Sequence, residues 1–184
     1  MGTECSYTFC SLFYQCICRF THGACGIYKV IDHDDVRSRY FTYHRDTPGS
    51  ALRINEPIQS RLTGRMTIIL SKRIDKQDGS FAGVLTAAID SDYFNRFYQT
   101  FQLGPDGSVT LLRNDGVVLI RWPLSERSTD LSGTDLFSKH LKLNSVGYYK
   151  IVSPFDGITK YIGYEATPHY PTIVTVAISE DWLL

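Results

Sequence analysis

The sequence predicts an α+β fold made of two small antiparallel sheets, each with flanking helices. Two apolar runs rich in β-branched residues, 66–74 and 81–89, are joined through Asp78–Gly79, a pair that favours a tight hairpin turn. After Ile89 the period of the apolar pattern changes from two to nearly four, and strand-like patterns return from Ser108 onward. This order of hairpin, helix and further strands is typical of α+β proteins.

The first elements are a short helix and an extended segment. Acidic and aromatic residues at helical spacing predict a helix over 34–44, which Pro48–Gly49 ends. Residues 52–58 are predicted to be extended, because Pro57 disfavours helix in the residue before it.

After the hairpin the sequence predicts an aromatic helix. Asp90 or Ser91 can cap its start, and it should end before Gly104–Pro105. Its aromatic residues fall on one stripe, namely Tyr93, Phe94, Phe97, Tyr98 and Phe101. The second half then predicts a helix over 134–141 and five strands, at 108–113, 117–121, 148–152, 160–164 and 173–178.

The first 30 residues predict a cysteine-rich leader. All the cysteines lie there, and their odd number cannot close completely into disulfides: Cys5, Cys10, Cys16, Cys18 and Cys25. A zinc site that adds His22 to the last three would have suitable ligands, but the spacing matches no common structural zinc motif. The chain contains neither a secretory signal pattern nor a run of ~18 apolar residues, so we expect no membrane span within it.

Composition and motifs limit the function. The 19 basic residues balance 19 acidic ones, so no bulk field attracts nucleic acid, and we expect no nucleic-acid partner. No nucleophile elbow, Gly-rich phosphate loop or zinc-hydrolase motif occurs. Residues 32–35 have metal-compatible side chains, but a solvated helix start explains them more simply. We expect a binding module without cofactor or metal rather than an enzyme.

Charged residues near the hairpin suggest a ligand site. Asp90 ends the second strand, where an acid can hold a cationic group by a charge-assisted hydrogen bond. Arg39, Arg61 or Arg65 can grip a carboxylate through two parallel hydrogen bonds. The alternative for Asp90 is a plain helix cap, and for Arg61 and Arg65 a solvated loop charge. His44 can equally be a packed or surface histidine.

The chain resembles the double Cache sensor domain found outside the membrane in bacterial receptors. The resemblance rests on the ordered phrases YFTYHRD, SRLTGR, DGSFAGVLTAAID, YFNRFY, GSVTLLRNDGVVLIRWP and GYYKIVSPFDGITKYIGYEATPHYPTIVTVAIS. It covers about 31–184 and looks closest to the sensors of membrane diguanylate cyclases, with those of histidine kinases next. It implies two PAS-like modules, a membrane-distal one at 31–104 that binds ligand and a membrane-proximal one at 105–184. The leader, 1–30, stands where the distal module's first helix and strands belong, so that module is expected to be incomplete.

The resemblance also implies site residues. The Tyr40–Phe41 pair matches the family's aromatic pair, and Tyr43 and His44 follow on the same segment. Asp90 matches the acid that meets a ligand ammonium in amino-acid-sensing relatives. Arg37–Ser38 stands where the family usually has Asp-Arg, which leaves the ligand type open. The expected ligand-binding residues are Arg39, Tyr40, Tyr43, His44, Arg61, Arg65 and Asp90.

The function implied is the sensing of a small molecule such as an amino acid or organic acid. The chain would be a non-catalytic sensor fragment of a diguanylate cyclase or histidine kinase, with the output domain beyond Leu184. It would lie on the periplasmic or extracellular face of the inner membrane, touch the membrane only through segments outside this chain, and pair as a homodimer in the intact receptor. The alternatives are a stand-alone soluble binding or interaction protein and, third, a small enzyme that uses the distal cleft.

Overall fold

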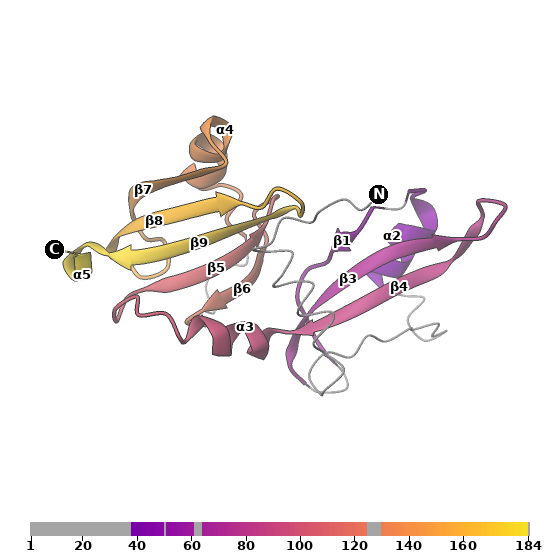
Figure 1. Cartoon of the computed structure of the whole chain (residues 1–184), viewed down its shortest axis with the longest axis horizontal. Coiled ribbons are helices and arrows are strands. Elements are labelled where there is room, and N and C mark those ends of the chain that lie inside the picture. The colour runs from indigo at the N-terminus through magenta and orange to yellow at the C-terminus, as the bar shows by residue number, and fades with distance from the viewer. Residues whose placement is uncertain (1–37, 50, 61–63, 125–129, 184) are drawn as a thin grey trace, which may run out of the picture. The chain divides into compact units, whose positions relative to one another are not determined.

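The structure is a computed structural model that describes residues 38–49, 51–60, 64–124 and 130–183. The chain divides into two compact units at Asp90, and each unit holds one antiparallel sheet (Figure 1). The predicted α+β class is confirmed. The cysteines, the zinc alternative and the acidic run lie outside the described residues.

A long hairpin forms the centre of the first unit. Strands β3 (Met66–Asp75) and β4 (Phe81–Asp90) pair from Thr67 opposite Asp90 to Asp75 opposite Phe81. Gly79 takes a φ of 80° in the turn, which glycine adopts without a steric penalty. The other edge of β3 pairs with two short strands, β1 (Arg53–Ile54) and β2 (Ile58–Gln59).

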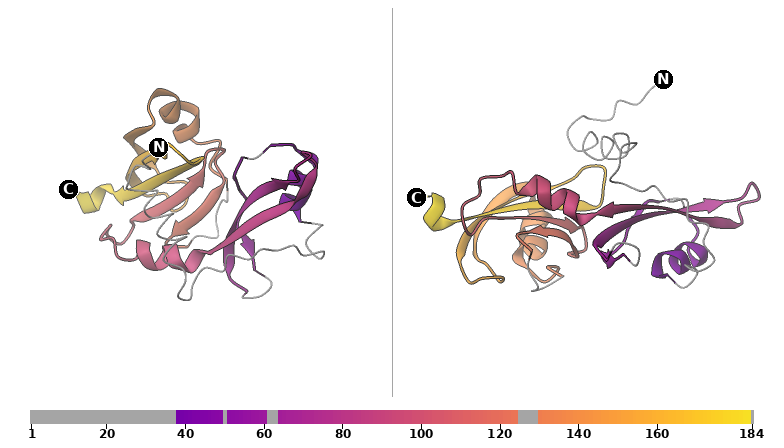
Figure 2. Two further views of the ribbon diagram at one scale, coloured as in Figure 1. Left: turned by 45° about the vertical axis from the view of Figure 1, so that its right-hand side comes forward. Right: turned by 90° about the horizontal axis from the view of Figure 1, so that it is seen from below.

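Helix α2 (Arg39–Asp46) covers one face of this hairpin (Figure 2). The Ser38 hydroxyl accepts a hydrogen bond from the backbone N–H of Phe41 at 3.3 Å and caps the helix. The ring of Phe41 meets that of Phe81 edge to face, with centroids 5.5 Å apart. The sequence prediction of an aromatic helix that ends before Pro48 is therefore confirmed within the described residues.

The second unit contains one five-stranded antiparallel sheet. Its sheet has the order β6-β5-β9-β8-β7. The strands are β5 (Ser108–Arg113), β6 (Val118–Trp122), β7 (Val146–Val152), β8 (Thr159–Ala166) and β9 (Thr172–Ser179). All five expected strands are present: β5 and β6 have the predicted length, β7 and β9 are two residues longer, and β8 is three residues longer.

Helices cover both faces of the second sheet (Figure 2). On one face lie the one-turn π-helical segment η3 (Leu136–His140) and α4 (Leu141–Leu143). They complete a core cluster of Leu112, Leu136, Tyr164 and Ile173. On the other face lies α3 (Ser91–Tyr98), and a last turn, α5 (Glu180–Leu183), was not expected from the sequence.

The contacts of α3 place it with the second unit. It packs against β6, and the division between the units falls at Asp90, whereas we expected the first module to extend to residue 104. This helix therefore belongs to the second unit, although Phe97 of its aromatic stripe is exposed. Tyr98 is its buried member, and burial raises the pKa of its hydroxyl to about 12.

Candidate functional site

Strand alternation places a polar row on the face of the first sheet that α2 covers. Because side chains alternate along a strand, Thr67, Ser71 and Arg73 share one face, and the register adds Asp90 opposite Thr67. Thr67, Ser71 and Arg73 are buried. A polar row beneath an amphipathic helix is where the predicted site residues can meet.

Arg65 and Asp90 meet at one end of this row. Nη1 of Arg65 donates to Oδ2 of Asp90 across 3.1 Å. The Arg65 side chain is 56% exposed and that of Asp90 is 28% exposed. An ion pair this open to water is worth at most about 1 kcal/mol. A ligand that offers its own ammonium and carboxylate can therefore exchange with the pair at low cost.

His44 occupies a second position, further along β3. Its imidazole is buried, and Nε2 lies 3.0 Å from Oγ of Ser71. The amide of Asn55 donates to the same hydroxyl at 2.9 Å. Burial lowers the pKa of His44, with the nearby charges of Arg53 and Arg73 acting in the same direction, so the neutral ring is favoured.

The two positions are separate. Ser71 stands four positions beyond Thr67 in β3, which corresponds to ~13 Å of strand, and Asp90 lies opposite Thr67. Arg65 therefore contacts Asp90, and His44 contacts Ser71. Among the contacts of the described residues, none joins His44 to Asp90. Both Asp90 and Arg65 are among the ligand-binding residues expected from the sequence, and the structure sets these two side chains side by side.

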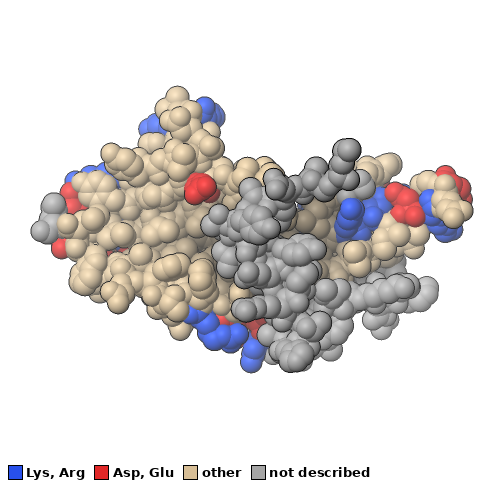
Figure 3. Space-filling view, in the orientation of Figure 1, with Lys and Arg blue, Asp and Glu red and all other residues tan. Residues whose placement is uncertain are grey.

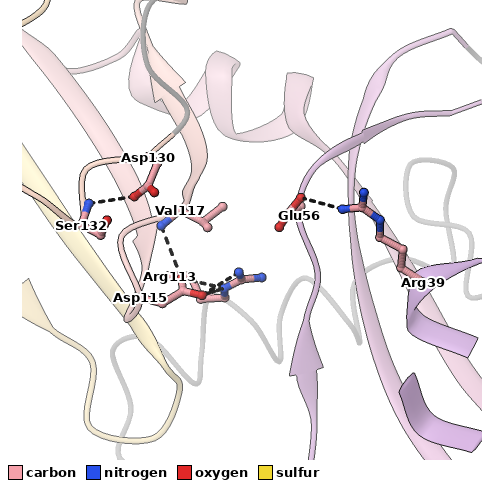
Figure 4. A network of polar contacts seen from close by, with 7 residues as sticks. All are labelled: Arg39, Glu56, Arg113, Asp115, Val117, Asp130 and Ser132. Carbon is pink, nitrogen blue, oxygen red and sulfur yellow. Dashed lines mark hydrogen bonds and ion pairs between the residues drawn. The ribbon is translucent and has the colours of Figure 1, made fainter. Parts of the chain in front are cut away.

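The other predicted residues point elsewhere. Arg39 reaches Glu56 at 3.8 Å with a 97% exposed side chain (Figure 4). Tyr43 is exposed and carries the guanidinium of Arg53 over its ring at 3.9 Å. Tyr40 is half-buried, and Arg61 lies outside the described residues.

A cavity that sequence reasoning missed lies in the second unit. Its volume is about 50 Å³, and it opens between the sheet face and the segment that carries Leu131 and Leu136. Two cationic side chains line it, Arg121 of β6 and Lys160 of β8. The sequence does carry a signal for this cavity, because Arg121 and Lys160 each stand inside a strand among apolar residues. A charged side chain at such a position would normally point to solvent. Only the strand register shows that these two lie on the sheet face that the helical segment covers.

The distribution of charges and of possible metal ligands limits the kinds of site that the described residues can form. Among the described residues that are visible in Figure 3, acidic and basic side chains are intermingled. Over the described ranges, no three His, Cys, Asp or Glu side chains gather closely enough to hold a metal ion. No helix among the described residues is long and apolar enough to cross a membrane.

Known proteins are similar to this chain in sequence and in fold. The profile of the dCache_1-like family, described as a histidine kinase sensor domain, matches residues 91–177. The extracellular domain of a protein described as a histidine kinase, rpHK1S-Z16, is 47% identical with a TM-score of 0.70, over 78% of this chain and 60% of its own length. Over residues 91–177 the chain matches the double Cache sensor family. The whole chain spans about three fifths of that relative's solved sensor.

More distant structures share the fold of this chain. The periplasmic sensory domain of the Campylobacter jejuni chemoreceptor Tlp1 has a TM-score of 0.64 at 14% identity, over 80% of this chain and 57% of its own. The ligand-binding domain of the Pseudomonas aeruginosa PAO1 chemoreceptor PctB, solved with L-Arg, has 0.58 at 14%, over 86% and 66%. A comparison with curated protein sequences gives no match.

Proposed function

We propose that this chain is the ligand-sensing part of a bacterial membrane receptor and that it binds a small zwitterion or organic acid in its first unit. The Arg65–Asp90 pair carries the proposal. Asp90 offers a carboxylate for a ligand ammonium and Arg65 a guanidinium for a ligand carboxylate, so together they complement an amino acid. The L-Arg bound by PctB, which shares the fold, is a ligand of this class.

In the receptor, the first unit would be the membrane-distal module and the second the membrane-proximal one. The likeness to histidine kinase and chemoreceptor sensors supports a position outside the cytoplasmic membrane. We favour a histidine kinase output because both the family profile and the 47% identical relative carry that description. A diguanylate cyclase output and a homodimeric receptor stay predictions. The sensor itself would signal by population shift, since a ligand biases two arrangements only through its different affinity for them.

A thermal-shift screen tests the ligand proposal. The 184-residue chain would be melted with each of a panel of L-amino acids and organic acids at constant ionic strength. A ligand that binds the folded state raises the midpoint in a saturable way. Asp90→Ala should abolish the shift produced by an amino acid. Asp46→Ala removes a carboxylate from another exposed ion pair, that with Arg45, and should leave the shift intact.

A shift that Asp90→Ala leaves unchanged would remove Asp90 from the site. Sequencing the DNA on both sides of the reading frame tests the receptor assignment separately. A membrane segment and a kinase or cyclase domain downstream are expected, and unrelated flanking genes would overturn the signalling role.

A further inference from the structure

The covered face of the second sheet carries a polar row where an apolar one is expected. The register sets Thr110 of β5 between Arg121 of β6 and Thr175 of β9, so three neighbouring strands point polar side chains into the cavity. Ser108 continues the row along β5. A sheet face beneath a helical layer usually buries apolar side chains, because each buried polar group needs a partner.

Arg121 is the residue of this row that lacks hydrogen-bond and charge partners most clearly among the described residues. Nη1 donates to Oγ1 of Thr110 at 2.9 Å, and the guanidinium lies over the ring of Phe155 at 4.0 Å. Its Nε is buried and has no hydrogen-bond partner among the described residues. Within the described residues no carboxylate contacts Arg121 directly, although the charge of Asp156 acts on it from further away, and burial lowers the pKa of its guanidinium. A half-buried cation without a direct anionic partner is unfavourable, so the geometry favours an anionic occupant.

Lys160 adds a second cation. Its side chain is 2% exposed, and Nζ donates to the backbone carbonyl of Asp106 at 2.6 Å and pairs with the carboxylate of Asp156. An ammonium has three donors, so one is left for a further acceptor. With Arg121 and Lys160 against Asp156, this end of the cavity carries one more positive than negative charge. Tyr149 adds no negative charge at neutral pH, since burial raises its pKa to about 12.

The volume of the cavity and its lining side chains limit which anion it can hold. The cavity of about 50 Å³ has room for about four water-sized groups, which corresponds to a ligand of roughly three to five non-hydrogen atoms. The side chains of Leu112, Leu136 and Ile162 supply an apolar wall. A hydrated inorganic anion gains nothing from that wall, whereas a short alkyl group does.

We propose that the second unit binds a short-chain monocarboxylate, of which acetate is the smallest alkyl member, with its carboxylate on Arg121 and Lys160 and its alkyl group against Leu112 and Leu136. The free Nε lies on an edge of the guanidinium, and guanidinium edges are suited to gripping a carboxylate. This site is additional to the one proposed at Asp90 and lies in the other compact unit.

The test on the unmodified chain compares acetate, propionate, acetamide and chloride. Isothermal titration and thermal melts would be run at one ionic strength, balanced with sodium chloride. Acetate or propionate should bind saturably and raise the melting midpoint, while acetamide, which has the same shape without the charge, should not. Equal behaviour of acetate, acetamide and chloride would overturn the proposal without any variant.

Variants then locate the site. Arg121→Gln should weaken acetate binding by roughly 10- to 100-fold, the range expected for loss of a charge-assisted hydrogen bond. Arg113→Gln, on the neighbouring strand β5, is the matched control, because Arg113 pairs with Asp115 outside the cavity (Figure 4). Full acetate affinity in a folded Arg121→Gln variant would also overturn the proposal.

The two proposed sites can fail independently. Asp90→Ala should keep the acetate response and lose the amino-acid response, and Arg121→Gln should do the reverse. Circular dichroism of each variant shows whether it is folded. If Arg121→Gln does not fold, Arg121→Lys, which keeps the charge but loses the planar fork, should still bind acetate more weakly than the unmodified chain.

Discussion

Nε2 of His44 lies 3.0 Å from Oγ of Ser71, and this contact joins α2 to the middle of β3 across 27 residues of sequence. The imidazole is buried against the sheet, where Asn55 shares the same hydroxyl. Such a contact fixes the helix on the hairpin only while the ring is neutral, since burial penalises the charged form.

We therefore expect the first unit to lose stability in mild acid through His44. Burial lowers its pKa below the ordinary value of 6.5, so below that pH the unfolded chain binds more protons than the folded one. The stability is fully present above about pH 6.5 and is lost as the pH falls from there through the folded pKa. Urea unfolding at a series of pH values measures this dependence. His44→Gln should flatten the curve below pH 6.5, whereas the same change at the exposed His169 should not. Parallel curves for the chain and its His44→Gln variant would contradict this account.

Arg73 should be the most sensitive charged residue of the first unit. Its side chain is 6% exposed, donates to the backbone carbonyls of His44 and Arg45 at the end of α2, and pairs with Asp75. Arg73→Met leaves those carbonyls without their donor, so we expect a loss of about 2–4 kcal/mol in unfolding free energy. Arg73→Lys should recover only part of it, because one ammonium cannot replace the fork.

Arg45→Met is the control for Arg73. Among the described residues, the exposed side chain of Arg45 pairs with the neighbouring Asp46 alone, so the unfolding midpoint should not move. Denaturant titrations followed by far-UV circular dichroism compare the variants. A similar midpoint for Arg73→Met and Arg45→Met would show that Arg73 does not hold α2 in place.

Local patterns predicted most of this fold. The hairpin around Asp78–Gly79 is a case where β-branched runs and turn chemistry point to the same structure, and its register also fixed Asp90 at the end of β4. The boundary between the units was not predictable in the same way. The stripe of α3 shows that one face is buried, but only tertiary contacts decide against which sheet.

The candidate sites divide in the same manner. Asp90 and Arg65 are close in the fold because Arg65 directly precedes β3 and Asp90 ends the paired strand β4. Arg121 and Lys160 come from strands β6 and β8 that are not neighbours in the sheet order. Their convergence on one cavity depends on which face η3 and α4 cover, and no local pattern carries that information.

Gly116 should be the least replaceable of three glycines in the second unit. It has a φ of 99°, and a Cβ there would lie 2.4 Å from the backbone N of Ser132. Its carbonyl also accepts from the N–H of Leu131, a residue of the cavity wall, at 2.8 Å. Gly116→Ala should therefore cost about 3 kcal/mol or more, from backbone strain and a clash with main-chain atoms.

Two other glycines separate those causes. Gly157 has a φ of 75°, and an added Cβ there would meet open space. Gly157→Ala should therefore cost about 1–2 kcal/mol, from the left-handed backbone conformation alone. Gly133 has open space and no left-handed φ, so its replacement should cost least. Thermal and urea unfolding of the three variants give the order. If Gly116→Ala is no worse than Gly157→Ala, the segment around Ser132 yields to the new methyl group.

Asp156 should be required for stability mainly because Lys160 is buried. The ammonium of Lys160 has Asp156 as its ion-pair partner, and its side chain is 2% exposed. Asp156→Asn removes the charge but keeps the shape, and the unpaired ammonium should cost about 1.5–3 kcal/mol of unfolding free energy. Lys160→Met together with Asp156→Asn should recover much of that loss, because the ammonium that needs Asp156 is then gone. A double-mutant cycle from urea unfolding at pH 7 measures the coupling between the two side chains. Additive losses would show that the contact between Lys160 and Asp156 contributes nothing to stability.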